Sequence, residues 1–176
     1  MGQQPTSAVN DTAVWPHIER EIEHHGDCRT HRRDHLGGRP CPRHHTRGHG
    51  TIRPNSGAFD ELPVTWAART EAPDGKTSPE ELAAAAHSSC FAMALSLCLG
   101  ERDIQPERLT VSSTVTLDEV DGKPTVVSSA LVVHGRVAGL DPDGFESVVD
   151  EAAALCPISR LFAGATIIIS SDLEPM

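Results

Sequence analysis

Aromatic residues are scarce in this sequence, which has no Tyr, two Trp and four Phe among 176 residues. No uninterrupted run of 18 or more apolar residues occurs, and the first fifteen residues do not place a basic start before an apolar segment. The sequence therefore predicts neither a membrane span nor a secretory signal, and we expect a cytoplasmic protein. Hydrophobic residues still make up 38%, which is enough for the core of one ordinary domain.

Positive charge is also scarce in the larger part of the chain. Residues 51–176 hold eight Lys or Arg against nineteen Asp or Glu, whereas residues 1–50 are nearly neutral and hold eight of the ten His. An acidic body repels phosphate backbones, so no nucleic-acid partner is expected. A small molecule of little charge, or another protein, fits this surface better.

Aliphatic residues are almost missing from residues 24–50, where Leu36 is the only one among Arg, His, Gly, Pro and Cys. No hydrophobic period survives in this stretch, so it cannot bury enough surface to order itself. We expect a poorly ordered His/Arg-rich segment over residues 1–47 and a folded domain over 48–176. Two origins of the segment stay open: a solvated tail, or a wrong reading frame or start site in a GC-rich gene.

Metal-binding motifs are not visible in this sequence. Neither CxxC nor HExxH occurs. Cys28, Cys41 and the His pairs at 24–25 and 44–45 raise the alternative of a metal-binding module in the N-terminal segment, but their spacing matches no zinc pattern. No metal ion and no bound cofactor are expected.

Secondary-structure signals predict an α+β domain. Period-2 alternation and turn residues indicate a hairpin closed by Asp121-Gly122, and the apolar run near the C-terminus reads as a strand. The predicted strands are 51–52, 63–69, 110–120, 125–137 and 165–169, and the predicted helices are 79–99, 144–155 and 157–162. Strands and helices in this order are typical of an α+β fold.

The predicted helix 79–99 is apolar on every face from Leu82 onward. Ser78 is a suitable N-cap, Pro79 suits the first helical position, and Gly100 is expected to end the helix. A domain with few aromatics can hardly enclose such a helix alone, and the small residues Ala83–Ala86 allow another backbone to approach. The pattern predicts a helix buried on all sides, with a partner chain of a homodimer supplying part of the cover.

Three cysteines lie in the predicted domain. Cys90 and Cys98 stand inside the long helix, where most lone cysteines are small buried residues. If Cys90 is reactive, a cation must hold it as thiolate, and Arg69 at the end of the predicted strand is the best candidate upstream. Cys156 precedes Pro157 at the start of the last short helix, where free N–H groups favour a thiolate. The alternative is that Cys156 is only a small buried residue at a corner of the chain, and the sequence fits both interpretations.

These pieces, taken in order, resemble the OsmC/Ohr family of organic hydroperoxide reductases. The stretches that carry the resemblance are 56–59 (SGAF), 66–70 (WAART), 77–97 (TSPEELAAAAHSSCFAMALSL) and 153–159 (AALCPIS). The resemblance implies an antiparallel sheet wrapped around a long buried central helix, in an intertwined homodimer. His87, before the Ser-Ser-Cys sequence, resembles the OsmC branch.

The resemblance also implies a function and a site. It implies a thiol-dependent peroxidase that reduces organic hydroperoxides, with Cys90 as the peroxidatic residue and Cys156 as its resolving partner in a disulfide. Arg69 matches the arginine that holds the thiolate, and Glu80 matches the carboxylate that orients this arginine. A dithiol, such as a lipoyl-bearing protein or another cellular thiol, would reduce the disulfide.

Spacing adds a constraint on this site. Glu80 and Cys90 are ten residues apart on one helix, about 15 Å along its axis, so we expect Glu80 of one chain to lie near Cys90 of the other. The alternative function is a catalytically impaired OsmC-like protein that acts as a small-molecule or metal-binding module. It stays open because the family's first strand is hinted at only by Gly26-Asp27.

Overall fold

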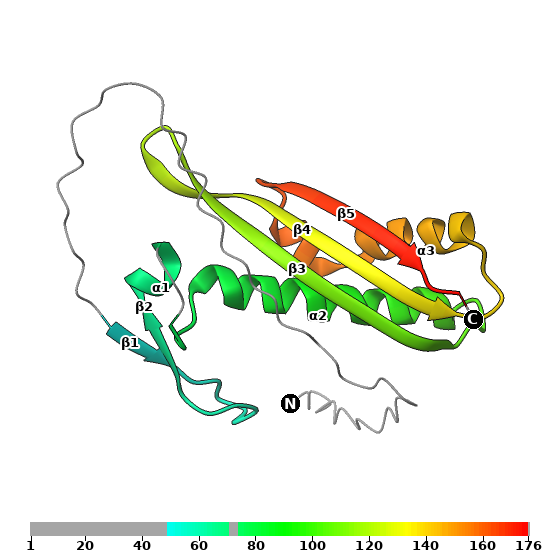
Figure 1. Ribbon diagram of the computed structural model, residues 1–176, viewed down its shortest axis with the longest axis horizontal. Helices are drawn as coiled ribbons and strands as arrows, with labels where there is room; N and C mark the ends of the chain where they lie inside the picture. Colours follow the sequence, from blue (N-terminus) through cyan, green and yellow to red (C-terminus); the bar gives the residue numbers. More distant parts are fainter. Residues whose placement is uncertain (1–48, 71–73, 176) are drawn as a thin grey trace, which may run out of the picture.

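One long helix organises the part of the chain that the structure describes, which is residues 49–70 and 74–175 of a computed structural model. This helix, α2 (Pro79–Gly100), lies under a three-stranded sheet, and a second helix runs beside it (Figure 1). The α+β class expected from the sequence is confirmed. The segment 1–47, expected to be poorly ordered, lies outside the described residues.

The start of α2 follows the sequence prediction, but its end does not. The Ser78 hydroxyl accepts a hydrogen bond from the Glu81 N–H at 3.2 Å, and Pro79 occupies the first turn. Gly100, expected just beyond the helix, is its last residue, and the left-handed backbone position is taken by Asp103, with φ of 56°. Asp tolerates this conformation better than most residues, so no glycine is needed there.

The sheet is built on a long hairpin. Strands β3 (Pro106–Val120) and β4 (Lys123–Val137) pair antiparallel, and both turn residues have positive φ, 51° at Asp121 and 75° at Gly122. That combination is the type I′ turn that two-residue hairpins favour. The last strand, β5 (Thr166–Leu173), pairs parallel with β4, so this sheet is mixed and not purely antiparallel as expected.

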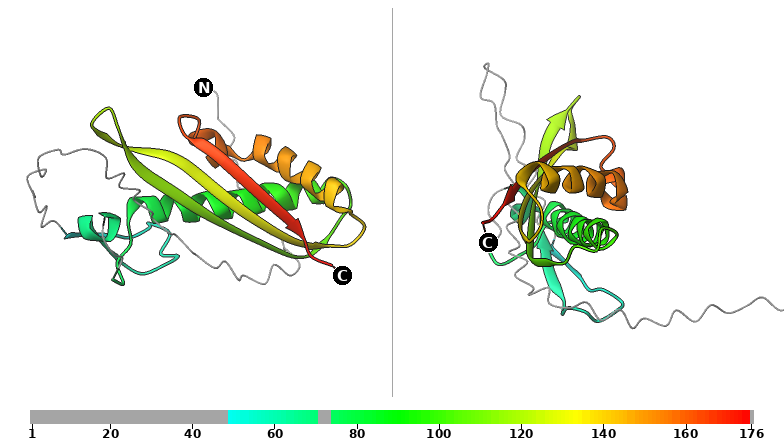
Figure 2. Two further views of the ribbon diagram at one scale, coloured as in Figure 1. Left: turned by 45° about the horizontal axis from the view of Figure 1, so that its top comes forward. Right: turned by 90° about the vertical axis from the view of Figure 1, so that its right-hand side faces the viewer.

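Two helices connect β4 to β5. Helix α3 (Pro142–Leu155) begins at the N-cap Asp141 and packs beside α2 on the same face of the sheet (Figure 2). Its Phe145 ring lies so close to Gly135 of β4 that a Cβ at this glycine would meet the ring at 2.3 Å. The short helix α4 (Pro157–Leu161) follows directly and contacts α2.

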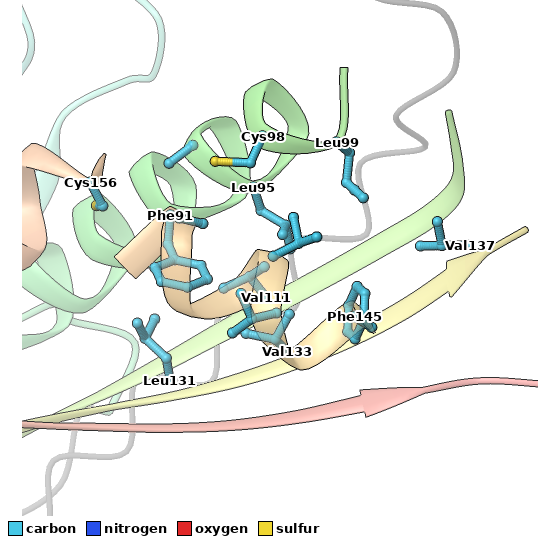
Figure 3. Packing of buried hydrophobic residues seen from close by; sticks show 14 residues of the cluster. Phe91, Leu95, Cys98, Leu99, Val111, Leu131, Val133, Val137, Phe145 and Cys156 are labelled. Carbon is cyan, nitrogen blue, oxygen red and sulfur yellow. The ribbon is translucent and has the colours of Figure 1, made fainter. Parts of the chain in front are cut away.

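The hydrophobic core lies between the sheet and the two longer helices. In Figure 3, Phe91, Leu95 and Leu99 of α2 point toward the strands, where Val111, Leu131 and Val133 face them. Each of these side chains is almost fully buried. Because only one face of α2 meets the sheet, the core uses only part of this helix.

The opposite face of α2 is open in the single chain, and the cover that the sequence analysis assigned to a partner chain stays a prediction. Met93 is 62% exposed and Leu97 is 48% exposed. By length and composition α2 could also cross a membrane, which differs from the sequence expectation, and 44% of its apolar window is buried in the fold. The core helix of a soluble domain passes the same test, and the buried face of α2 packs on strands and helices of this domain.

The N-terminal elements stand apart from the three-stranded sheet. Strands β1 (His49–Ile52) and β2 (Leu62–Thr65) form a separate antiparallel hairpin beside the N-terminal end of α2 (Figures 1 and 2). The predicted strand 63–69 is wrong beyond Thr65, where the chain enters the short helix α1 (Trp66–Thr70). The Thr65 hydroxyl accepts a hydrogen bond from the Ala68 N–H at 3.1 Å, as an N-cap does.

Candidate active site

Two free thiols meet where α2 passes the junction of α3 and α4. Cys90 lies at the middle of α2, and Cys156 is both the C-cap of α3 and the N-cap of α4. The two side chains are within hydrogen-bonding reach of each other, although 66 residues separate them in the sequence. Cys156 is fully buried at the edge of the core (Figure 3), and Cys90 is partly buried.

The first turn of α4 directs backbone N–H groups at both sulfur atoms. The Ile158 N–H donates to the Cys90 sulfur, and the Ser159 N–H donates to Cys156 Sγ at 3.4 Å. Pro157 has no N–H and suits the first helical position, so the chain can turn sharply into α4 after Cys156. This turn supplies partial positive charge to both sulfurs.

The pKa of Cys90 is nevertheless raised in the single chain. Burial is the largest cause, and the neighbouring Cys156 thiol raises the pKa further, while the hydrogen bond from the Ile158 N–H lowers it. Within residues 49–70 and 74–175, no cation is among these causes. A reactive thiolate at Cys90 therefore needs a positive charge from outside this set of contacts.

A guanidinium and a carboxylate form a second pair near the start of α2. Arg69 of α1 donates from Nε and Nη2 to the same Glu80 oxygen, Oε1, at 2.8 and 2.5 Å. The guanidinium also lies over the Trp66 ring, 5.0 Å from its centroid. Glu80 is almost fully buried, and its second oxygen, Oε2, has no hydrogen-bond partner among the described residues.

The four residues singled out from the sequence therefore form two pairs. Cys90 lies with Cys156, and Arg69 lies with Glu80, whereas ten residues of continuous helix separate Glu80 from Cys90. This separation is about 15 Å along the axis of α2. The two pairs of one chain do not form a single cluster.

His87, three residues before Cys90, makes contacts that could not be predicted from the sequence. Its ring is fully buried, and its Nδ1 and Nε2 atoms bond to the hydroxyls of Ser129 (2.7 Å) and Ser159 (2.9 Å). The ring also stacks on Phe162, with centroids 5.0 Å apart. A histidine inside an otherwise apolar helix was the available signal, but its partners lie 42 and 72 residues further along the chain.

An α+β fold that joins two free thiols at its central helix places the chain among proteins with a paired-cysteine site. The chain belongs to the OsmC-like family, since the family model described as "OsmC-like protein" matches residues 72–171. It is 39% identical to peroxiredoxin OsmC of Escherichia coli K12 over 115 residues, which cover 65% of this chain and 80% of the relative.

More distant relatives carry hydroperoxide-resistance names. An organic hydroperoxide resistance protein-like protein of Staphylococcus epidermidis is 31% identical over 121 residues, covering 67% of this chain and 81% of that protein. Among solved structures, the organic hydroperoxide resistance protein OhrB of Bacillus subtilis has a TM-score of 0.55 and 24% identity, covering 72% of this chain and 96% of OhrB. This structural likeness shows a shared fold.

Proposed function

We propose that this protein is a thiol-dependent peroxidase that reduces organic hydroperoxides to alcohols. Its OsmC-like family and the names of its relatives support a peroxide-related function of the oxidoreductase type. The single observation that carries the proposal is the contact between the Cys90 and Cys156 thiols. Two thiols within reach can complete a redox cycle without a bound cofactor.

The chemistry takes place in two steps. The Cys90 thiolate attacks the distal peroxide oxygen, the O–O bond breaks, and the alkoxide takes a proton and leaves as an alcohol, so Cys90 becomes a sulfenic acid. Cys156 then attacks the sulfenic sulfur, a disulfide forms, and the hydroxyl leaves with a proton as water. An external dithiol, such as a lipoyl group or another cellular thiol, supplies the two electrons that restore both thiols.

A homodimer is the proposed active form. The open face of α2 carries the exposed residues Ala86, Met93 and Leu97, and Cys90 lies between them on the same side of the helix. A second copy of the whole chain, which brings more than its α2, would remove this apolar stripe from water. The β1–β2 hairpin supports the same proposal, because a two-stranded hairpin alone is marginally stable in water.

Pairing of two α2 helices would also complete the active site. In an antiparallel pair related by a twofold axis, Glu80 of the partner subunit faces Cys90 when the helices cross at Ala85, halfway between positions 80 and 90. Ala85 lies within the run Ala83–Ala86, whose small side chains permit a close crossing. The partner subunit's Arg69 would then supply the cation that Cys90 needs, and the partner subunit's Glu80 would hold this arginine.

A peroxide-consumption assay tests the proposed function. Wild type, Cys90→Ser and Cys156→Ser are compared with cumene hydroperoxide and dihydrolipoamide. We expect turnover in wild type, no turnover in Cys90→Ser, and in Cys156→Ser a single oxidation of Cys90 without disulfide formation. If wild type does not consume peroxide, the proposal fails and a binding role is favoured; turnover that survives Cys90→Ser assigns the nucleophile elsewhere.

A further inference from the structure

A hydrogen-bonded network of polar side chains crosses the apolar core beside the paired thiols. The Ser113 and Ser129 hydroxyls are 3.2 Å apart, Ser129 bonds to Nδ1 of His87, and Nε2 of His87 bonds to the Ser159 hydroxyl. All four residues are buried, so each hydrogen bond replaces one that water would otherwise supply. This network joins β3, β4, α2 and α4.

His87 contacts α4 through two of its residues. Its Nε2 bonds to Ser159 in the first turn, and its ring stacks on Phe162, the C-cap of this helix. Ser159 is also the residue whose N–H donates to Cys156 Sγ, and the preceding N–H, of Ile158, donates to Cys90. The turn that places both sulfurs is therefore the turn that His87 holds.

The position of His87 on α2 makes this contact a link between the two cysteines. His87 and Cys90 are three residues apart, which places them on neighbouring positions of one helix face. Helix α4 has five residues and is too short to hold its own position by backbone hydrogen bonds alone. The hydrogen bond from His87 to Ser159 fixes α4 to α2, the helix that carries Cys90. It therefore also fixes the distance between the two sulfurs.

We infer that His87 is a positioning residue for the resolving step, which holds the Cys156 turn within bonding reach of Cys90 through the Ser159 hydroxyl. This inference rests on the proposed peroxidase function. On its other side, the His87 ring bonds to Ser129, which bonds in turn to Ser113. Both serines lie on the sheet and not on α4. Loss of the Ser159 hydroxyl and loss of the Ser129 hydroxyl should therefore differ in their effect on catalysis.

The consequence of a misplaced turn follows from the chemistry of the sulfenic acid. When Cys156 reaches it, the disulfide forms and water leaves. When Cys156 does not, a second hydroperoxide molecule transfers its distal oxygen to the sulfenic sulfur, releasing a second alcohol and leaving a sulfinic acid. The fraction of Cys90 that ends as disulfide or as sulfinic acid reports how well Cys156 is placed.

Ser159→Ala and Ser129→Ala form a matched pair of variants, because each deletes one hydroxyl bonded to the same ring. Each protein is treated with excess cumene hydroperoxide, and intact and peptide masses give the disulfide and sulfinic fractions of Cys90. We expect Ser159→Ala to raise the ratio of sulfinic acid to disulfide about fivefold, the factor that corresponds to loss of one typical hydrogen bond. Ser129→Ala is expected to match wild type in this ratio, while both variants lose similar thermal stability.

Three further measurements complete the test. His87→Phe, which keeps the stacked ring and removes both hydrogen bonds, should behave like Ser159→Ala, and Ser159→Thr, which keeps the hydroxyl, should restore the wild-type ratio. The rate of the first oxidation of Cys90 is measured separately in each variant, because displacement of the turn also moves the Ile158 N–H that lowers the pKa of Cys90. Equal ratios in Ser159→Ala and Ser129→Ala overturn the positioning role; absence of any Cys90–Cys156 disulfide in wild type overturns the proposed function instead.

Discussion

Two guanidinium nitrogens of Arg69, Nε and Nη2, donate to one carboxylate oxygen of Glu80, Oε1. Oε2 of Glu80 is buried without a hydrogen-bond partner among the described residues. A buried carboxylate oxygen in this state is costly unless another group donates to it. The charged pair with Arg69 therefore offsets part of the cost of burying this carboxylate.

Replacing Glu80 by Gln removes the charge that holds Arg69 and keeps a side chain of similar size. If Arg69 lowers the pKa of Cys90 in the dimer, Glu80→Gln should raise this pKa and reduce kcat/KM for cumene hydroperoxide by about tenfold or more, since a charged hydrogen bond contributes about 1.5–3 kcal/mol. The pH dependence of Cys90 alkylation by iodoacetamide measures the pKa. Glu81→Gln, one residue along the same turn, is the control, and equal effects of the two variants would contradict the role of Glu80.

A shared site predicts complementation between two inactive variants. In a mixed dimer of Cys90→Ser and Arg69→Met, one site has lost both residues and the other has kept both. Co-refolded mixtures should therefore regain up to about half of the wild-type activity per mixed dimer, measured as peroxide consumption. If each chain serves its own Cys90, both sites of the mixed dimer are defective and the mixture stays inactive.

Charge on the open face of α2 should prevent dimer formation. Leu97 is 48% exposed and lies two turns from Cys90, so Leu97→Glu adds a charge to the stripe without touching the thiol. We expect a monomer by sedimentation at micromolar concentration, together with loss of most peroxidase activity. Ile168→Glu is the matched control, because Ile168 is 54% exposed on β5, and it should sediment and react as wild type. A dimeric, active Leu97→Glu protein would exclude this face from the interface.

Burial of His87 should make the fold sensitive to acid. Burial lowers the pKa of His87 below the ordinary value of 6.5, so below this pH the unfolded chain binds a proton that the folded chain resists. Stability from this group is complete above pH 6.5 and falls as the pH drops, by up to about 1.4 kcal/mol at pH 5.5. Urea unfolding at pH 7.5 and 5.5 measures the loss, and His87→Phe should lose less stability over this interval than wild type. An identical loss in both proteins would show that other groups cause it.

Local features of the fold were readable from the sequence wherever neighbouring residues decide them. Ser78 and Pro79 marked the start of α2, and Asp121-Gly122 marked the hairpin turn, because capping and turn chemistry act over a few residues. The switch from strand to helix at Trp66 was not predicted, because a cap from Thr65 overrides a pattern that suits a strand. The parallel pairing of β5 with β4 was not predicted either, because it depends on where α3 and α4 return the chain.

The sequence by itself determined the long apolar helix, its central cysteine, and the family to which its motifs point. The family resemblance implied that Cys156 pairs with Cys90 and Glu80 with Arg69, but only the tertiary structure shows these contacts, and only it places His87 against the turn that carries Cys156. The physical reason is range: propensities and caps act within one or two turns, whereas these contacts join residues up to 72 positions apart. Such contacts exist only after the sheet and helices have packed.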